Sequence, residues 1–441
     1  MNGTRMLMVT SLYPYGQGET FVVAELEHVS PCFSRVDVVP SFYDPDTSPR
    51  PESNPIDLAY ADKRWGPLRA PRMVGALLMA LLKYRWVNDF GYVLARGRRL
   101  ANLKELVRAL YRARMFERFL ADKARRAGPD GIHDVIYFYW LVPEIVGAVQ
   151  FRKASGAPVR IVCRAHRGDL YEDLKPGGYA GLRREIIAGI DEVYCISDHG
   201  SRYLHRRFPE SAVKFRTARL GVDDPGYLNR QPQDGPLAIV SCSFVIASKR
   251  LHLIVGAIAR LLEDHPALQV RWTHIGDGPL LDAVKAQAAR LGERAQVVFK
   301  GYQTQAEVMA LYRDERFDLI INVSDSEGIP VSLMEACAAG IPIVATNVGG
   351  SAEIVSTANG VLLDADADAA TIATAMLRFN DRIAARACRR AARQFWDARF
   401  NAATNYARFG RQLAGRDGSR AGTPCTLVAL ETPHDRDPAA G

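Results

Sequence analysis

The sequence predicts an α/β protein built from two doubly wound domains, and three observations support this prediction. Short β-branched runs alternate with longer helical patterns along most of the 441 residues. Many of these runs are continuously apolar, which is typical of strands covered on both faces in a parallel sheet. A stretch rich in Pro, Gly and Asp, residues 224–236, interrupts the alternation near the middle of the chain. Strand–helix repeats on both sides of this break indicate two Rossmann-like sheets.

Five strands are expected in each half. In the first half they are residues 5–11, 36–40, 135–139, 159–165 and 192–197, and in the second half residues 237–241, 270–275, 296–300, 318–323 and 343–346. A ligand shared by two such domains would lie between them, at the C-terminal ends of the strands.

The predicted N-terminal domain spans residues 1–228 and includes a basic helical insertion at about residues 60–126. The predicted C-terminal domain spans residues 229–395. Residues 396–414 are expected to form a helix that packs back toward the N-terminal domain. The tail, residues 415–441, is rich in Gly, Asp and Pro and is expected to be disordered.

Composition narrows the class of partner and the compartment. The formal net charge of +8 suits an acidic partner such as a nucleotide, a phospholipid surface or nucleic acid. The basic segment, residues 60–126, holds 17 Lys and Arg against 5 Asp and Glu, so its local excess is larger than that of the whole chain. It is expected either to lie on an anionic membrane surface as amphipathic helices or to be a solvated helical insertion. No nucleic-acid recognition motif accompanies it, so nucleic acid is not an expected partner.

The expected location is the cytoplasm, with contact at the inner face of the cytoplasmic membrane as an open alternative. The N-terminus lacks the long apolar core of a signal peptide, and the longest apolar stretch, residues 73–82, is about half of the ~20 residues that cross a bilayer. The seven cysteines form no CxxC pair and are odd in number. They favour buried free thiols over a disulfide framework or a zinc site.

The strongest local pattern is SDSEGIPVSLMEACAAG, residues 324–340, directly after an expected strand. Pro330 suits the first helical position, and Gly340 followed by Pro342 stops the helix. The first free N–H groups and the helix dipole form a site for a diphosphate. The residues at this helix mouth are Gly328, Ile329, Pro330, Val331 and Ser332.

Two carboxylates flank this helix mouth. Glu327 is expected on the loop before the helix and Glu335 about two turns inside it. Both can accept hydrogen bonds from hydroxyl groups on either side of a bound diphosphate. Sugars present such hydroxyls, whereas a bare phosphate does not.

A basic pair follows the first strand of the second domain, in SCSFVIASKRLHLI, residues 241–254. Lys249 and Arg250 are expected to open a helix and to face the diphosphate, where two cations would neutralise the charge of a leaving group. Ser243 lies on the same segment and is a further candidate for donor binding.

Three further segments contribute candidates. In RAHRGDLYED, residues 164–173, His166 follows a strand and points toward the space between the domains; Arg164, Arg167 and Asp169 are weaker candidates. In SLYPYGQGETF, residues 11–21, glycines at two positions let backbone approach a ligand closely. HIGDGPLL, residues 274–281, is a second strand-to-helix turn of this kind. The glycines of the two turns are Gly16, Gly18, Gly276 and Gly278.

At these residues the chain resembles the large retaining glycosyltransferase family numbered four, which has the GT-B fold and a Glu-x7-Glu hallmark. Glu327 and Glu335 have that spacing within EGIPVSLMEACAAGIPIVATNVGG. The resemblance implies that Glu327 holds the hydroxyls of the donor sugar and Glu335 the ribose, and that His166 is the active-site histidine. The glycine loop of residues 16–18 would lie against donor and acceptor, and the turn of residues 276–278 around the nucleotide.

One position departs from the family pattern. The family has an Arg about six residues before the Lys that corresponds to Lys249, and here that position falls on Ser243 or Phe244. The resemblance covers residues 237–361 well and the N-terminal half only in patches. It does not cover the basic segment.

The resemblance implies a retaining, metal-independent transferase that moves a sugar from a nucleotide diphosphate sugar to an acceptor hydroxyl. The expected acceptor is a lipid-linked saccharide in the synthesis of exopolysaccharide or another cell-surface glycan. No cofactor and no metal ligand set are expected. The DADAD run at residues 364–368 follows the core motifs and fits a solvated turn. Two alternatives stay open: a nucleotide-sugar epimerase of the same fold, and a non-catalytic partner that binds a nucleotide or polysaccharide. The donor base and sugar, the linkage formed and the oligomeric state are not determined by the sequence.

Overall fold

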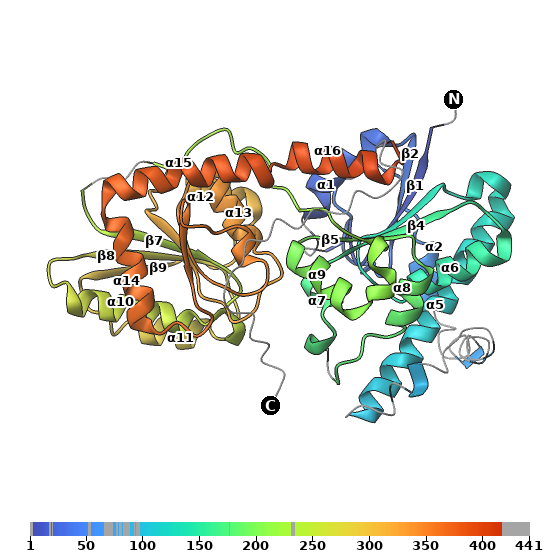
Figure 1. Cartoon of the computed structure of the whole chain (residues 1–441), viewed down its shortest axis with the longest axis horizontal. Helices are drawn as coiled ribbons and strands as arrows, with labels where there is room; N and C mark the ends of the chain where they lie inside the picture. The colour runs from blue at the N-terminus through green and yellow to red at the C-terminus, as the bar shows by residue number, and fades with distance from the viewer. Residues whose placement is uncertain are drawn as a thin grey trace.

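The computed structural model contains two six-stranded parallel sheets (Figure 1). It describes residues 3–416 except residues 17–18, 20, 52–53, 176 and 231–233 and most of residues 66–97, of which only 74–75, 78, 82, 89–91 and 93 are described. Gly18 and the predicted disordered tail from residue 417 onward lie outside the described residues.

The N-terminal sheet has the strand order β2-β1-β3-β4-β5-β6, and all its pairings are parallel. Its strands are β1 (Arg5–Thr10), β2 (Arg35–Pro40), β3 (Val135–Phe138), β4 (Arg160–Ala165), β5 (Glu192–Cys195) and β6 (Phe215–Thr217). The chain leaves β1 toward β2 and then returns to the other side of β1 as β3. This reversal places a topological switch point at the C-terminal ends of β1 and β3, where doubly wound sheets bind ligands.

Helices cover both faces of this sheet, as the continuous apolar runs predict. Alternate residues of β1 illustrate the division: Leu7 and Val9 pack with α5, α6, α8 and α9, whereas Met6 and Met8 pack with α1 and α16. The helices of this domain are α1 (Phe21–Val29), α2 (Ala59–Trp65), α5 (Arg99–Ala127), α6 (Glu144–Ser155), α7 (Arg167–Leu170), α8 (Arg183–Gly189) and α9 (Asp198–Arg207).

The C-terminal sheet has the order β12-β11-β10-β7-β8-β9, so its first three strands lie on one side of the switch point and its last three on the other, an order that differs from that of the N-terminal sheet. Its strands are β7 (Leu237–Cys242), β8 (Val270–Ile275), β9 (Ala295–Phe299), β10 (Leu319–Asn322), β11 (Ile343–Thr346) and β12 (Gly360–Leu363). The switch point lies between β7 and β10, so the loops that follow these two strands meet at one edge of the sheet.

The helices of the C-terminal sheet also form two layers. Residues of α10, α11 and α14 pack on one face, and residues of α12, α13 and α15 pack on the other. Their bounds are α10 (Leu251–Asp264), α11 (Leu281–Ala288), α12 (Gln305–Asp314), α13 (Val331–Ala338), α14 (Ala369–Leu377) and α15 (Arg382–Arg399).

The last helix, α16 (Ala402–Leu413), returns to the N-terminal domain. In Figure 1, α15 and α16 follow one another along one side of both domains. Tyr406, Phe409 and Leu413 of α16 are buried against the face of the N-terminal sheet that α1 also covers. At the crossing, Val222 donates its N–H to the Phe400 carbonyl at 2.8 Å.

The predicted pair of doubly wound parallel sheets is confirmed, and the differences concern edges and helix starts. Strands β6 and β12 were not predicted, because they are short edge strands of three and four residues. Helix α13 begins at Val331, with Pro330 as its N-cap residue in an extended conformation, so Glu335 lies about one turn inside the helix and not two.

The basic segment is only partly described. Helix α5 spans 29 residues, and its apolar face, including Leu106, Leu110 and Phe116, is buried in the core of the N-terminal domain. Within this segment, Leu78 and Leu82 are exposed. Within the described part of the chain, no helix is both long and apolar enough to cross a membrane.

Candidate functional site

The predicted polar residues of the C-terminal domain meet at the switch point of its sheet. Lys249 follows β7 and Glu327 follows β10, and their side chains form an ion pair with Nζ to Oε1 at 2.5 Å. They are 78 residues apart in sequence. Only the adjacency of β7 and β10 brings them together.

Glu327 is held by three donors and is only 9% exposed. Besides Lys249, its Oε1 accepts hydrogen bonds from Asn322 Nδ2 at 3.1 Å and from Ser324 Oγ at 2.7 Å. Two of these donors are neutral and come from the end of β10 itself. The carboxylate therefore keeps its orientation if the lysine moves to another anion.

The loop that presents Glu327 packs against a second glycine turn. Gly350 donates its N–H to the Gly328 carbonyl at 2.7 Å. A Cβ on Gly349, whose φ is +55°, would lie 1.9 Å from the Glu327 carbonyl oxygen. This close approach fixes the loop at the N-terminus of α13, where the first N–H groups have no partner within the helix. Ile329 and Pro330 are buried there, and Val331 and Ser332 are half-buried.

Glu335 lies on α13 and is 8% exposed. Its Oε1 accepts a hydrogen bond from Gln305 Nε2 at 3.0 Å. Burial raises the pKa of Glu335 to about 7, which the Gln305 hydrogen bond only partly opposes. A carboxyl group that titrates near neutrality is typical of functional sites, although structural networks produce such values as well.

Arg250 is placed differently from Lys249. It is the N-cap residue of α10 with φ +49°, and its guanidinium donates to the Val323 carbonyl at 2.6 Å and the Ser324 carbonyl at 3.1 Å. Its side chain therefore ties the start of α10 to the loop after β10. This position stabilises the loop that carries Glu327.

The loops after β7 and β8 contact each other through glycine. Ser243 donates its N–H to the Ile275 carbonyl at 3.0 Å. A Cβ on Gly276, which has φ +139°, would lie 1.9 Å from the Ser243 carbonyl oxygen, and one on Gly278 would lie 2.6 Å from the Val245 carbonyl oxygen. Larger residues would separate these two loops, which border the same switch point.

His166 lies across from this site, at the end of β4 in the N-terminal domain. It is the N-cap residue of α7, and Asp169 Oδ1 accepts its backbone N–H at 2.6 Å. Its ring stacks on Tyr139 at 4.9 Å and lies 4.4 Å from the Trp140 ring, centroid to centroid. The side chain is 8% exposed, and neither ring nitrogen has a hydrogen-bond partner among the described residues.

The segment after His166 reaches the C-terminal domain. Arg167 donates from Nε and Nη2 to Ser326 Oγ at 3.0 and 2.7 Å, and a Cβ on Gly328 would lie 2.7 Å from the Arg167 Cβ. The residue that follows His166 thus packs on the residue that follows Glu327. The segments that carry His166 and Glu327 are therefore in contact across the two domains.

A second bridge fixes the same arrangement. The Glu353 carboxylate of the C-terminal domain accepts the N–H groups of Asp198 at 2.9 Å and His199 at 2.8 Å, at the first turn of α9. A carboxylate at a helix N-terminus is stabilised by the free N–H groups and the helix dipole. No motif in the sequence pointed to Glu353, because the contact joins elements 155 residues apart.

The turn after β1 has a residue that sequence inspection missed. Gly16 is exposed with φ +66°. Glu19 accepts the N–H groups of Leu12 and Tyr13, each at 2.7 Å, and also the indole N–H of Trp140. In the sequence, only the position of Glu19 at the end of GQGE hints that it binds this turn. The hydrogen bonds of Glu19 hold the glycine turn beside Trp140.

Arg164 is a structural residue. It is fully buried, pairs with Glu25 at 2.8 Å, and lies 4.1 Å from the centre of the Phe409 ring of α16. Its side chain is therefore enclosed between the sheet, α1 and α16 as part of a buried ion pair.

Two Rossmann-like parallel sheets in one chain, in contact at the ends of their strands, are the architecture of the GT-B class of α/β protein. Residues 229–395 match the model of the family described as glycosyl transferases group 1.

Relatives with similar sequences act in polysaccharide synthesis, according to their names. The glycosyltransferase WcaL of Escherichia coli, named for colanic acid biosynthesis, is 31% identical over 173 residues, 38% of this chain and 42% of the relative. The Vi polysaccharide biosynthesis protein VipC/TviE of Salmonella typhi is 30% identical over 200 residues, 42% of this chain and 33% of the relative. The matched region is thus less than half the length of these relatives.

Solved structures match over nearly the whole chain. The lipopolysaccharide outer core galactosyltransferase WaaB has a TM-score of 0.64 at 15% identity, with 94% of this chain and 99% of that chain covered. Anabaena Alr3699/HepE, solved with UDP and glucose, has a TM-score of 0.60 at 15% identity, with 93% and 100% covered. At this identity the likeness shows the fold alone, and it is the GT-B fold.

Proposed function

We propose that this chain is a retaining glycosyltransferase that moves a sugar from a nucleotide diphosphate sugar to an acceptor hydroxyl. The observation that supports this most is the composite site: Glu327 and Lys249 lie paired before α13, and the residue after His166 packs on the residue after Glu327. A carboxylate, a cation and free helix N–H groups together suit the hydroxyls of a sugar joined to a diphosphate.

The diphosphate would lie at the N-terminus of α13. The N–H groups near Ile329, Val331 and Ser332 would donate to its oxygens, and Lys249 would exchange its pairing with Glu327 for the phosphate. Glu327 would then hold the sugar hydroxyls, since Asn322 and Ser324 keep it in place. Glu335 would accept from the ribose hydroxyls.

Arg167 would supply the second cation of the site. The family position for an Arg before Lys249 is Ser243 or Phe244 here. Arg167 comes instead from the opposite domain, and its guanidinium is hydrogen-bonded to Ser326 in the loop that presents Glu327. Two cations and a helix N-terminus would stabilise the charge that develops on the leaving diphosphate. In this proposal they take the role of a metal ion.

Transfer would break the bond from the anomeric carbon to the phosphate oxygen and form a bond to the acceptor oxygen on the same face. The leaving phosphate would take the proton of the acceptor hydroxyl. His166 would contact the sugar near the reacting carbon, because its ring nitrogens make no hydrogen bond among the described residues and lie beside Trp140 and Tyr139. Configuration at the anomeric carbon would be retained.

We further propose that the acceptor is a saccharide, lipid-linked, used in the synthesis of a cell-surface glycan. The relatives named for colanic acid, Vi polysaccharide and amylovoran synthesis support this proposal. The exposed Leu78 and Leu82 within a strongly basic segment support contact with an anionic membrane surface on the cytoplasmic side. Co-sedimentation with anionic liposomes that is unchanged by deletion of residues 66–97 would contradict the membrane contact.

The experiment that tests the function is a thermal-shift screen of the full chain against UDP, GDP and ADP sugars, followed by product analysis. A ligand present at 100 times its Kd stabilises the folded state by about 2.7 kcal/mol. A glycosylated acceptor supports the transferase. An epimerised donor indicates an epimerase of the same fold, and binding of a nucleotide diphosphate without turnover indicates a non-catalytic partner.

A further inference from the structure

Four aromatic rings form one cluster at the switch point of the N-terminal sheet. They are Phe21 at the start of α1, Tyr139 and Trp140 after β3, and His166 after β4. All six pairs of these rings lie 4.4–6.4 Å apart, centroid to centroid. The shortest of these distances joins Trp140 to His166. The position of the Trp140 indole therefore bears directly on the His166 ring.

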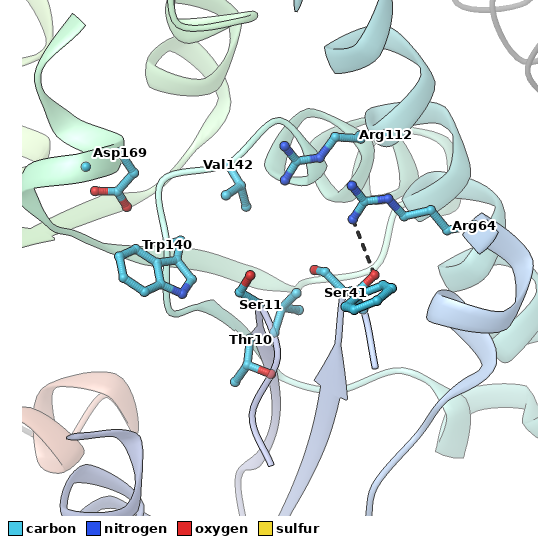
Figure 2. Close-up of a pocket in the computed structure, with 11 residues that line it drawn as sticks. Thr10, Ser11, Ser41, Arg64, Arg112, Trp140, Val142 and Asp169 are labelled. Carbon is cyan, nitrogen blue, oxygen red and sulfur yellow. Dashed lines mark hydrogen bonds between the residues drawn. The ribbon is translucent and has the colours of Figure 1, made fainter. Parts of the chain in front are cut away.

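Trp140 also lines a cavity of about 430 Å³ (Figure 2). This volume is within the range of about 300–1,000 Å³ that is typical of small-molecule sites. Ser11 follows β1, is exposed and lines the same cavity. Figure 2 shows Trp140 and Asp169 on one side of the cavity and Arg64 and Arg112 on the other. The cavity thus has one side with an aromatic ring and one side with two cations.

The two arginines are already bound by protein groups. Arg112 contacts the buried Glu144 carboxylate through Nη2 at 2.8 Å, and Arg64 Nη1 lies 3.4 Å from the same carboxylate. Arg64 also donates to the Ser41 carbonyl at 3.3 Å, as the dashed line in Figure 2 marks. These contacts account for both side chains, so we assign the ligand contact to the side of the cavity that holds Trp140.

The Trp140 indole is held by Glu19. One carboxylate oxygen of Glu19, Oε1, accepts the indole N–H and also the backbone N–H of Ser11, the latter at 3.1 Å. The other oxygen accepts the N–H groups of Leu12 and Tyr13, each at 2.7 Å. Four N–H groups therefore converge on a carboxylate that is only 8% exposed. This hydrogen bonding fixes the edge of the indole, so its ring presents a defined surface to the cavity.

Glu19 also has an unusual backbone conformation. Its φ is +56°, in the left-handed region that residues other than glycine rarely adopt. Such a conformation costs free energy and persists only where surrounding contacts impose it, which happens most often at ligand-binding and active sites. The four hydrogen bonds of the carboxylate supply those contacts. A glutamate kept in this conformation supports a functional role for the turn that it holds.

We propose that the acceptor saccharide packs on the Trp140 indole in this cavity, and that Glu19 is the positioning residue that holds the indole for it. The inference rests on the proposed function, because it assigns residues to the acceptor of the transfer. The C–H groups on one face of a sugar ring are apolar and pack on an aromatic ring, whereas its hydroxyl groups need polar partners such as Ser11. Because Trp140 contacts the His166 ring, a sugar packed on it lies beside the proposed reacting centre.

The test measures binding of methyl glycosides to the full chain by saturation-transfer difference NMR. The probes are methyl glucoside, methyl galactoside and methyl N-acetylglucosaminide. Each is titrated in the presence of saturating UDP, GDP or ADP, whichever stabilises the chain in the thermal-shift screen. Trp140→Leu removes the aromatic ring and keeps an apolar side chain. Trp140→Phe keeps a ring but removes the N–H that Glu19 binds.

Glu19→Gln is designed to break the contact with Trp140 selectively. The amide oxygen can still accept the two backbone N–H groups bound at 2.7 Å, but the NH2 group then faces the indole N–H. Glu307→Gln is the matched control. Glu307 also accepts a backbone N–H, from Thr304 at 2.7 Å, but it lies on α12 in the C-terminal domain.

We expect at least one glycoside to bind the wild type, with the strongest saturation at the C–H protons of its ring. Trp140→Leu should weaken this binding about five- to tenfold, the range of one lost contact with an aromatic ring, and Trp140→Phe should weaken it less. Glu19→Gln should weaken binding when residue 140 is Trp and should have no further effect in Trp140→Phe, because the N–H through which it acts is gone. Glu307→Gln should bind like the wild type.

Each of three results would overturn the proposal. If the wild type binds none of the glycosides, or if it and Trp140→Leu bind them equally, the acceptor does not pack on this ring. If Glu19→Gln weakens binding equally with Trp and with Phe at position 140, Glu19 does not act through the indole and only supports the turn after β1.

A second readout separates these results from misfolding and from failure of the proposed function. The thermal shift that the nucleotide diphosphate produces should be the same in the wild type and in every variant, since each variant leaves the C-terminal domain unchanged or altered only at Glu307. A wild type that binds none of UDP, GDP and ADP would contradict the transferase itself. Equal nucleotide binding with unchanged glycoside binding in Trp140→Leu would contradict only the acceptor assignment.

Discussion

The two halves of the site differ in how their polar groups are arranged. In the C-terminal domain the Glu327 carboxylate has three donors, and Arg250 ties its loop to α10. In the N-terminal domain neither ring nitrogen of His166 makes a hydrogen bond within the described chain, although Nδ1 lies 4.0 Å from Asp169 Oδ2 and the ring is fixed by stacking. A group that is already oriented can bind with little further ordering, whereas an unpaired buried group costs free energy until a ligand pairs with it. Under the proposed function, Glu327 is therefore oriented before the donor binds, whereas a ligand would supply the first hydrogen bond to the His166 ring.

The largest expected effect is on turnover, and it comes from substitutions in the C-terminal half of the site. Glu327→Ala and Lys249→Ala should each lower kcat by about two orders of magnitude, in the range of a lost electrostatic contact to a transition state. Steady-state kinetics with the donor found in the nucleotide screen measures this. Arg260→Ala, at an exposed pair with Asp264 on α10, is the control and should keep wild-type turnover. Normal activity in both site variants would remove Glu327 and Lys249 from the site.

The next effect is on stability and concerns Glu335. Its folded-state pKa of about 7 lies above the ordinary value of 4.5, so the folded protein holds this proton more tightly than the unfolded chain. Its contribution to stability is full below about pH 4.5 and is lost as pH rises through 7. Glu335→Gln should therefore increase the free energy of unfolding by about 2–3 kcal/mol at pH 8 and by less than about 1 kcal/mol at pH 5.

Urea denaturation at the two pH values measures this difference. Glu307→Gln, an exposed carboxylate on α12 whose pKa is lowered by hydrogen bonds to Thr304, is the matched control. It should show no gain at pH 8. A Glu335→Gln variant that gains equally at both pH values would mean that Glu335 titrates normally in the folded protein.

Substitutions at the contact between the two domains should have a smaller effect on turnover. Arg167→Ala should lower kcat by about ten- to a hundredfold if the guanidinium assists the leaving diphosphate, since one charged hydrogen bond is worth about 1.5–3 kcal/mol. Ser326→Ala removes the hydroxyl that Arg167 binds but leaves the cation, so it should change kcat much less. Similar losses in the two variants would mean that Arg167 only joins the domains.

The smallest expected effect is on the pH dependence of donor binding. If Glu335 accepts the ribose hydroxyls as a carboxylate, protonation below its pKa of about 7 weakens binding. The Kd for the nucleotide diphosphate should then rise by up to about tenfold between pH 8 and pH 6. Glu335→Gln should show a flat profile over this range, and a steep profile in that variant would place the titrating group elsewhere.

The sequence predicted the C-terminal site better than the N-terminal one, for a physical reason. Glu327, Pro330 and Glu335 belong to one loop and helix, so their spacing describes their geometry directly. Contacts such as Arg167 with Ser326, or Glu353 with the start of α9, join residues more than 150 positions apart and leave no local pattern.

The edge strands and the first residues of helices were also predicted less well from the sequence. Strand β12 follows a turn and pairs on one side only, with β11. It is four residues long, and an apolar run of that length cannot be distinguished from a loop in the sequence. Pro330 is extended, so it precedes α13 and is not its first helical residue. Its carbonyl accepts the first hydrogen bond of the helix.

The crossing of the C-terminal helices limits how the two domains can move. Val222 exchanges backbone hydrogen bonds with Phe400 and Ala402, and Trp396 donates its indole N–H to the Val222 carbonyl at 3.0 Å. A Cβ on Gly221 would lie 2.3 Å from the Ala402 Cα, so the two passages of the chain are in backbone contact there. Both covalent connections between the two domains are held together at this one point. A motion that separates the domains would therefore pivot about it. The Arg167 and Glu353 contacts lie away from this point, so under the proposed function they would break if the domains separated to admit a donor.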